Sequence, residues 1–154
     1  MVNAPARQPP VAARRVGYVI AAALTAVFWY LVNVRPGWEA LAFLTDDAER
    51  VIPLLDVSLA ASLVANVLYL AYDAPWFKAV GDIATTSIGI AVLVRVWQVF
   101  PFTFTGSFDW SLAVRVTVMM AIVGSIIAIA VNVVALVRGA AHAGGAGMAG
   151  RRAQ

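Results

Sequence analysis

The chain has 154 residues, of which 62% are hydrophobic and 12% are charged, and its mean hydropathy is +0.86. This composition excludes an ordinary water-soluble globular domain. Cysteine is absent, so thiol catalysis and disulfide exchange lack their side chain. His142 is the single histidine, and we therefore expect neither a metal site nor a cofactor. The net charge of +3 is spread over the termini, which excludes a nucleic-acid-binding face.

Four apolar runs are each long enough to cross a bilayer, because a helix needs about 20 residues to span roughly 30 Å of hydrocarbon. These runs cover residues 16–34, 51–72, 79–100 and 110–137. The predicted fold is therefore an all-α polytopic membrane protein, a four-transmembrane-helix bundle within residues 14–138. The tails, residues 1–13 and 139–154, are rich in Pro or in Gly and Ala, and we expect both to be disordered.

Residues that start helices stand between the runs. Asp46 followed by Glu49 is typical of a capping box that opens the helix of the second run. Pro53 then either kinks that helix or lies in its first turn. Residues 73–75, Asp-Ala-Pro, are expected to cap and begin the third helix, and Asp109 the fourth.

The distribution of Lys and Arg predicts the orientation of the four helices, because short cytoplasmic segments retain positive charge. One side of the membrane carries two of these residues, Arg35 and Arg50, among acidic neighbours. The other side carries seven: Arg7, Arg14, Arg15, Lys78, Arg138, Arg151 and Arg152. We expect a multi-pass protein of the plasma membrane with both termini in the cytoplasm. The first run exceeds the roughly 7 to 15 residues of a signal-peptide core, so we interpret it as an uncleaved helix.

Three ionisable side chains lie inside the apolar runs, namely Asp56, Arg95 and Arg115. Each lies about five residues from the predicted outer boundary, at a depth of roughly 7 to 8 Å. Helical side chains lean toward the helix N-terminus, so Asp56 and Arg115 lean outward and Arg95 leans toward the bilayer centre. Arg95 is therefore expected to need a partner, and Asp56 is the acidic residue at matching depth.

Three interpretations of Asp56 and Arg95 remain open. The two residues form an ion pair that fixes the register of two helices, or Arg95 with Arg115 and Gln98 borders an outward-facing site for an anion. In the third interpretation, the charged groups reach the interface separately. Arg115 lies opposite a stripe of small residues on its helix, which we expect to face neighbouring helices while Arg115 faces lipid or a partner subunit. That stripe consists of Ala121, Gly124, Ala128 and Ala135.

A second polar layer is predicted nearer the cytoplasmic side. Asn66 and Asn132 lie at matching depths, and Thr85, Thr86 and Ser87 enter the membrane at about the same level. Hydrogen bonds between helices at this layer are the expected role, with an ion or substrate path as the alternative.

Two further features of the sequence concern the surface. Lys78 and Asp82 have the i, i+4 spacing of a helix-surface ion pair. Aromatic residues are concentrated in the predicted outer loop at Phe100, Phe102, Phe104 and Phe108, which is typical of lipid anchoring or of a surface that docks a partner.

Catalysis would require a nucleophile with a base, a paired acid and base, or a metal centre, and the sequence contains no motif for any of these. We therefore expect a small non-catalytic membrane protein, a subunit or scaffold of a larger assembly. Its expected partners are the bilayer and another membrane protein or a second copy of the chain. The alternative is a binding or transport component with an anion or lipid-headgroup site around Arg95. The preference for Arg over Lys and the abundance of Ala favour a GC-rich bacterial source.

Overall fold

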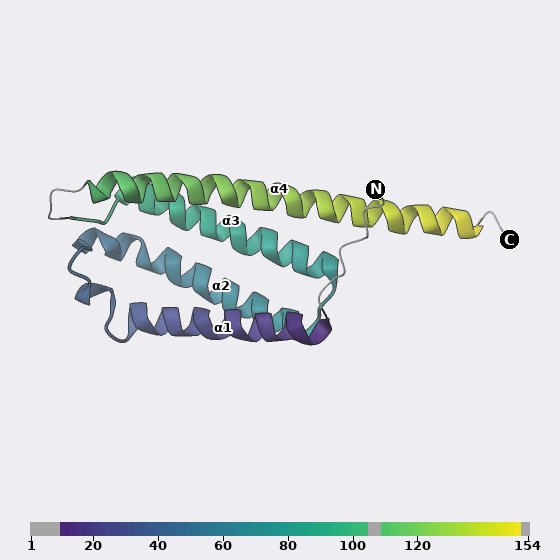
Figure 1. Ribbon diagram of the computed structural model, residues 1–154, viewed down its shortest axis with the longest axis horizontal. Coiled ribbons are helices and arrows are strands. Elements are labelled where there is room, and N and C mark those ends of the chain that lie inside the picture. The colour runs from purple at the N-terminus through teal and green to yellow at the C-terminus, as the bar shows by residue number, and fades with distance from the viewer. Residues whose placement is uncertain (1–9, 105–108, 152–154) are drawn as a thin grey trace, which may run out of the picture.

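The computed structural model describes residues 10–104 and 109–151, with side chains described as far as Arg138. Four long helices follow one another up and down (Figure 1), and each is long and apolar enough to span a membrane. They are α1 (Val11–Asn33), α2 (Ile52–Ala71), α3 (Pro75–Val99) and α4 (Trp110–Arg151). The first loop contains two 3-10 helices, η1 (Trp38–Ala40) and η2 (Asp46–Arg50). The number and order of the long helices agree with the sequence prediction.

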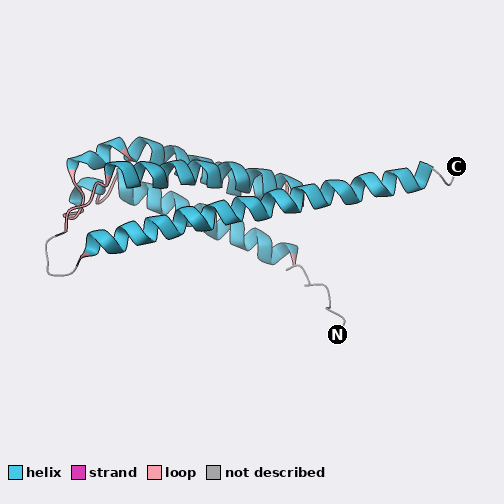
Figure 2. Cartoon of the chain, turned by 90° about the horizontal axis from the view of Figure 1, so that it is seen from above, coloured by secondary structure: helices cyan, strands magenta, loops and turns pink. Residues whose placement is uncertain are grey.

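The two ends of the molecule differ in what they contain. We call the end with η1, η2 and the α3–α4 connection the loop end, and the end with the start of α1 and the α2–α3 connection the terminal end. At the terminal end α4 runs well past the other helices (Figures 1 and 2). Residues 139–151 are thus helical and not disordered as expected, because Ala favours helix and this segment extends a helix that is already nucleated. The predicted disorder of residues 1–9 and 152–154 lies outside the described residues.

The helix starts confirm some of the sequence signals. Pro53 lies in the first turn of α2 and Pro75 in the first turn of α3, where the fixed φ suits a helix and the missing N–H has no intrahelical acceptor to lose. The Asp109 carboxylate accepts the N–H of Leu112 at 3.0 Å and caps α4 as predicted.

Two predicted caps are wrong. Asp46 opens η2 without a side-chain cap, since Thr45 holds the N-cap position, and α2 begins only at Ile52. Asp73 does not cap α3, because Ala74 is its N-cap residue. The Asp73 carboxylate instead accepts hydrogen bonds from Arg14 and Tyr18 of α1.

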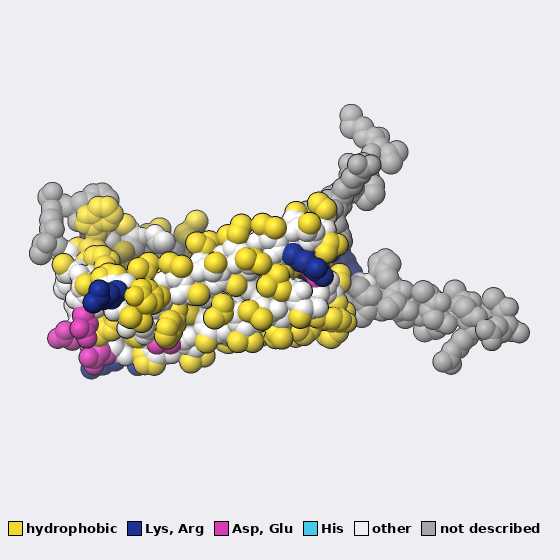
Figure 3. All heavy atoms as spheres, turned by 90° about the horizontal axis from the view of Figure 1, so that it is seen from below, with side chains coloured by type: hydrophobic (Ala, Val, Ile, Leu, Met, Phe, Trp, Pro, Cys, Tyr) yellow, Lys and Arg dark blue, Asp and Glu magenta, His cyan; other side chains and the backbone are white. Residues whose placement is uncertain are grey.

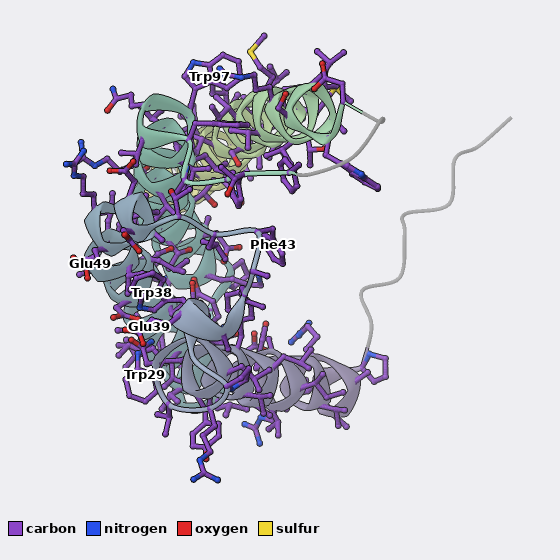
Figure 4. All side chains as sticks on the ribbon, turned by 90° about the vertical axis from the view of Figure 1, so that its left-hand side faces the viewer. Trp29, Trp38, Glu39, Phe43, Glu49 and Trp97 are labelled. Atoms are coloured by element: carbon purple, nitrogen blue, oxygen red, sulfur yellow. The ribbon has the colours of Figure 1, made fainter. Side chains whose placement is uncertain are left out.

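The helices pack in chain order, α1 on α2, α2 on α3 and α3 on α4. Within the described parts, α1 and α4 share no extended contact, so the four helices form an open arc. Seen from the loop end, one side of the arc is open between α1 and α4, and Phe43 lies on that side (Figure 4). Apolar side chains cover the middle of the face seen in Figure 3, and charged groups gather toward its two ends.

The rotation of α4 also differs from the prediction. Val118, 7% exposed, is its buried residue, whereas Gly124, Ala128 and Ala135 are exposed. A Cβ added at Gly124 would meet no atom within 4 Å, so the small-residue stripe faces away from α3. The reason is Arg115, which lies on the opposite side of α4 and is held against aromatic rings at the end of α3.

The closest approach of α2 and α3 is at Gly81. The ring of Tyr69, 4% exposed, lies directly over this glycine. A Cβ at position 81 would lie 2.9 Å from Cζ and 3.0 Å from Cε1 of Tyr69, and closer still to its hydroxyl oxygen. Gly81 therefore permits the contact that buries Tyr69.

We predict that Gly81→Ala lowers the free energy of unfolding by about 1 to 3 kcal/mol, because the new methyl group forces Tyr69 out of place. Gly89→Ala is the matched control on the same helix, since nothing lies within 4 Å of its added Cβ. Thermal unfolding in detergent micelles measures both. Equal unfolding temperatures for the two variants would contradict the packing described here.

Candidate functional site

Asp73, in the connection between α2 and α3, is the centre of a polar contact with α1. Its Oδ2 accepts the Nε of Arg14 at 2.9 Å and lies 2.7 Å from the Nη2 of the same guanidinium. Its Oδ1 accepts the hydroxyl of Tyr18 at 2.9 Å. Two guanidinium nitrogens on Oδ2 and a phenol on Oδ1 thus hold one carboxylate, which ties the start of α1 to the α2–α3 connection.

A second carboxylate lies beside the first, on α3. The Tyr69 hydroxyl donates to Oδ1 of Asp82 at 3.0 Å and lies 3.2 Å from the Lys78 carbonyl oxygen. The Lys78 ammonium donates to Oδ2 of Asp82 at 2.9 Å, which is the predicted i, i+4 pair. Asp82 therefore also receives a bond from α2, which the spacing along α3 did not predict.

Aromatic contacts join these two halves. The rings of Tyr18 and Tyr69 meet edge to face with centroids 5.6 Å apart. The Lys78 Nζ lies 5.8 Å from the centroid of Tyr18 and 5.3 Å from that of Tyr69. We call the six residues the terminal-end network: Arg14, Tyr18, Tyr69, Asp73, Lys78 and Asp82.

The charges of the terminal-end network balance, with two cations and two carboxylates each in direct contact. The hydrogen bond from Tyr18, and then the bonds from Arg14, lower the pKa of Asp73 below its ordinary value. The carboxylate is therefore ionised at neutral pH. This arrangement is suited to joining three helices, since its donors and acceptors are directed at one another.

Sequence reasoning missed that Tyr18 and Tyr69 share a network with Asp73. The available signal was their common depth near one membrane boundary, where a Tyr hydroxyl seeks a polar partner. Common depth does not specify which sides of the helices face each other, so the partners required the tertiary structure.

The structure does not bring Asp56 and Arg95 together. Asp56 Oδ1 accepts the side-chain amide of Asn33 at 2.7 Å, at the end of α1. The Nε of Arg95 donates to the backbone carbonyl of Arg50 at 3.3 Å, so this side chain curls back toward the loop end. No ion pair joins the two in the described part of the chain, because a neutral amide and a carbonyl at the loop end lie nearer to each group.

Arg115 is exposed on α4 and packs against two aromatic rings, while its contact with lipid or a partner subunit stays a prediction. Its guanidinium carbon lies 4.2 Å from the ring centroid of Phe100 and 5.3 Å from that of Trp97. These cation–π contacts join the start of α4 to the end of α3. Gln98 is exposed on α3, so the four residues of the predicted anion site are not gathered around one cavity.

The predicted inner polar layer does not link helices. The Asn66 amide donates to the Ser62 carbonyl at 2.8 Å, the Thr85 hydroxyl to Gly81 at 2.9 Å and the Ser87 hydroxyl to Ile83 at 2.7 Å. Each of these bonds stays within one helix, because the carbonyl four residues earlier is always within reach. Thr86 and Asn132 make no side-chain hydrogen bond to any described residue.

The aromatic loop residues form a ladder with the first loop. The rings of Phe43 and Phe104 are stacked with centroids 6.4 Å apart, and those of Phe102 and Phe104 with centroids 6.1 Å apart. Phe100 meets Phe102 edge to face at 5.6 Å. The ladder ends at Arg115, so these rings are partly used to hold the two loops and α4 together. Phe108 lies outside the described residues.

No protein family matches the chain, and no curated protein or solved structure shows significant similarity to it. Among the described residues, no three His, Cys, Asp or Glu side chains come together in a way that would hold a metal ion. What can be said of function therefore rests on the geometry of this chain.

The lowered pKa of Asp73 predicts a pH dependence of stability. A carboxylate whose pKa is lower in the folded than in the unfolded state stabilises the fold above the unfolded pKa, about 3.9 for Asp, and this contribution is lost as pH falls through the folded value. Asp73→Asn should therefore unfold at a lower temperature than the wild type at pH 7, with the difference closing in acid. Thermal unfolding in micelles between pH 7 and 3 measures this.

Asp47→Asn is the control for that experiment, because Asp47 makes an exposed pair with Arg50 in η2. Such surface pairs contribute about 0 to 1 kcal/mol. A difference between wild type and Asp73→Asn that persists unchanged to pH 3 would show that Asp73 does not act through its charge.

Proposed function

We propose that this protein is a small non-catalytic subunit or scaffold of a larger membrane assembly, and that Asn132 is the observation that best supports this role. Asn132 lies on α4, six residues before Arg138 and so about 9 Å inside the end of the span. Its side-chain amide makes no hydrogen bond within the described part of the chain. Two donors and an acceptor are thus left without partners in a segment where Ala, Val, Ile and Leu surround Asn132 along the helix.

A partner helix is the simplest way to satisfy this amide. A polar group without a hydrogen-bond partner in hydrocarbon raises the free energy of the folded protein by several kcal/mol. Water is too scarce in a membrane interior to remove this cost completely. Helix α4 packs on α3 alone, so the side of α4 toward the open part of the arc is accessible to another helix. Asn132 is itself half-buried, and Ala128 and Ala135 beside it on the helix are exposed, which allows close approach.

The proposed setting is a plasma membrane crossed by all four helices, with both termini in the cytoplasm. The terminal end carries Arg14, Arg15, Lys78 and Arg138, and the loop end carries Glu39, Asp46, Asp47 and Glu49 with only Arg35 and Arg50. This asymmetry supports a cytoplasmic terminal end.

An anion or lipid-headgroup site around Arg95 receives less support. Arg115 is occupied by aromatic rings, and Arg95 bonds to the Arg50 carbonyl beside Asp47 and Glu49. Acidic neighbours repel an anionic ligand. We therefore do not carry this function further.

Replacing Asn132 tests the proposal, and the chain provides a matched control. We expect Asn132→Leu to weaken association in native membranes about three- to twentyfold, since one interhelical hydrogen bond in a membrane is worth about 0.6 to 1.7 kcal/mol. Asn66→Leu should leave association unchanged, because the Asn66 amide bonds to its own helix. Co-purification after mild solubilisation and photobleaching steps of labelled chains in membranes report the association. A strictly monomeric wild-type protein would contradict the proposal.

The orientation is tested by single cysteines, which are unambiguous because the natural chain has none. We expect Glu39→Cys to react with a membrane-impermeant maleimide in intact cells, and Gln154→Cys to react only after the cells are opened. Labelling of position 154 in intact cells would reverse the orientation.

A further inference from the structure

A cavity at the loop end is built by three segments of the chain. Its volume is about 320 Å³, and Ala42, Phe43, Thr103, Phe104 and Trp110 line it. The first loop supplies two of these residues, the segment after α3 supplies two, and α4 supplies its first residue. A cavity of this size is at the lower end of the range for small-molecule sites, about 300 to 1,000 Å³.

The walls of this cavity are held in place by backbone pairing. The Thr103 N–H donates to the Phe43 carbonyl at 2.9 Å, and the Thr45 N–H donates to the Pro101 carbonyl at 3.1 Å. Between them Leu44 and Phe102 form an antiparallel bridge. The stacking of Phe43 on Phe104, with ring planes 11° apart, then fixes the aromatic wall. Such a wall exists before any ligand arrives, which lowers the cost of binding.

The chemistry of the lining selects an uncharged, apolar ligand. None of the five lining side chains carries a charge, and the rings of Phe43 and Trp110 are 43% and 52% exposed. A charged metabolite would lose hydration here without meeting an opposite charge on any lining side chain. Hydrocarbon can instead contact the exposed aromatic rings.

The position of the cavity indicates the form of this hydrocarbon. Phe43 lies on the open side of the arc (Figure 4), and Trp110 is the first residue of a membrane-length helix. Directly below Trp110 on the same face of α4 lie Thr117, Ala121 and Gly124, and the space beside Gly124 is open. These small side chains lie on the face of α4 that leads from the cavity toward the middle of the span.

We propose that the cavity binds the upper part of one acyl chain of a membrane lipid, with the rest of the chain lying along α4. This inference needs the four helices to span a membrane, but it does not depend on the proposed partner helix, since Asn132 lies in the other half of α4. The aromatic rings contact the acyl chain, and binding does not require a hydrogen bond from the Thr103 hydroxyl.

Tryptophan quenching tests the proposal, because Trp110 borders the cavity. The protein in unbrominated detergent micelles is titrated with phosphatidylcholine whose acyl chains carry bromine, a contact quencher. We expect a saturable component at about one lipid per chain that Trp110→Phe removes. Ala42→Phe, which fills the cavity, should weaken the binding about tenfold or more. Ala26→Phe, at an exposed position on α1, should leave it unchanged.

Two results would overturn the proposal. Quenching that rises without saturation, or that is the same in Ala42→Phe and Ala26→Phe, would mean that Trp110 meets only bulk lipid. Loss of binding in Thr103→Val, which keeps the shape and removes the hydroxyl, would mean a polar ligand. Circular dichroism and the unfolding temperature establish that each variant is folded. Trp110→Phe leaves the cavity nearly intact and so serves where Ala42→Phe does not fold.

Discussion

Polar side chains inside apolar helices need hydrogen-bond partners within reach, and this requirement shapes most of the structure. Hydroxyl and amide groups along the middle of the helices meet it locally, by bonding to the carbonyl four residues earlier, as Thr25, Asn66 and Thr117 do. Such bonds hold no helix to another. The polar and aromatic contacts that join the helices are therefore found at the two ends, where side chains from different helices and loops can meet.

The two ends use different chemistry for this purpose. At the terminal end, carboxylates accept from a guanidinium, an ammonium and two phenols, and the rings of Tyr18 and Tyr69 pack between them. At the loop end, aromatic rings stack on one another, and Arg115 lies over the last of them. Between these ends the arc is held by apolar packing alone, and α4 has a neighbour on one side only. Asn132, like Thr86, is not satisfied locally, and its amide has two donors and an acceptor to satisfy, which is why it carries the proposed role.

The same requirement explains why the predicted site was only partly right. Depth along a helix is readable from the sequence, so Asp56 and Arg95 do lie toward the same end of the molecule, and Lys78 with Asp82 were correctly paired by their spacing. The side of the helix facing a neighbour is not readable in that way. Asp56 accepts a hydrogen bond from Asn33, which lies at the end of α1. The predicted pairing of Asp56 with Arg95 considered only charged partners on other helices. The stripe of small residues on α4 was expected to face a neighbouring helix. In the structure Arg115, on the opposite side of α4, lies over Phe100 of the α3 end, and the stripe faces away from α3.

The sequence by itself determined that four long helices form and, to within a few residues, where α2, α3 and α4 begin, because apolar length, the two helix-starting prolines and the Asp109 cap act over a few neighbouring residues. It also determined the i, i+4 pair of Lys78 with Asp82. Only the tertiary structure decided that the helices form an open arc, that Asp73 belongs to α1 through Arg14 and Tyr18, and that two loops enclose a cavity above α4. These features depend on the rotation of each helix about its axis, which is set by contacts between residues far apart in the chain.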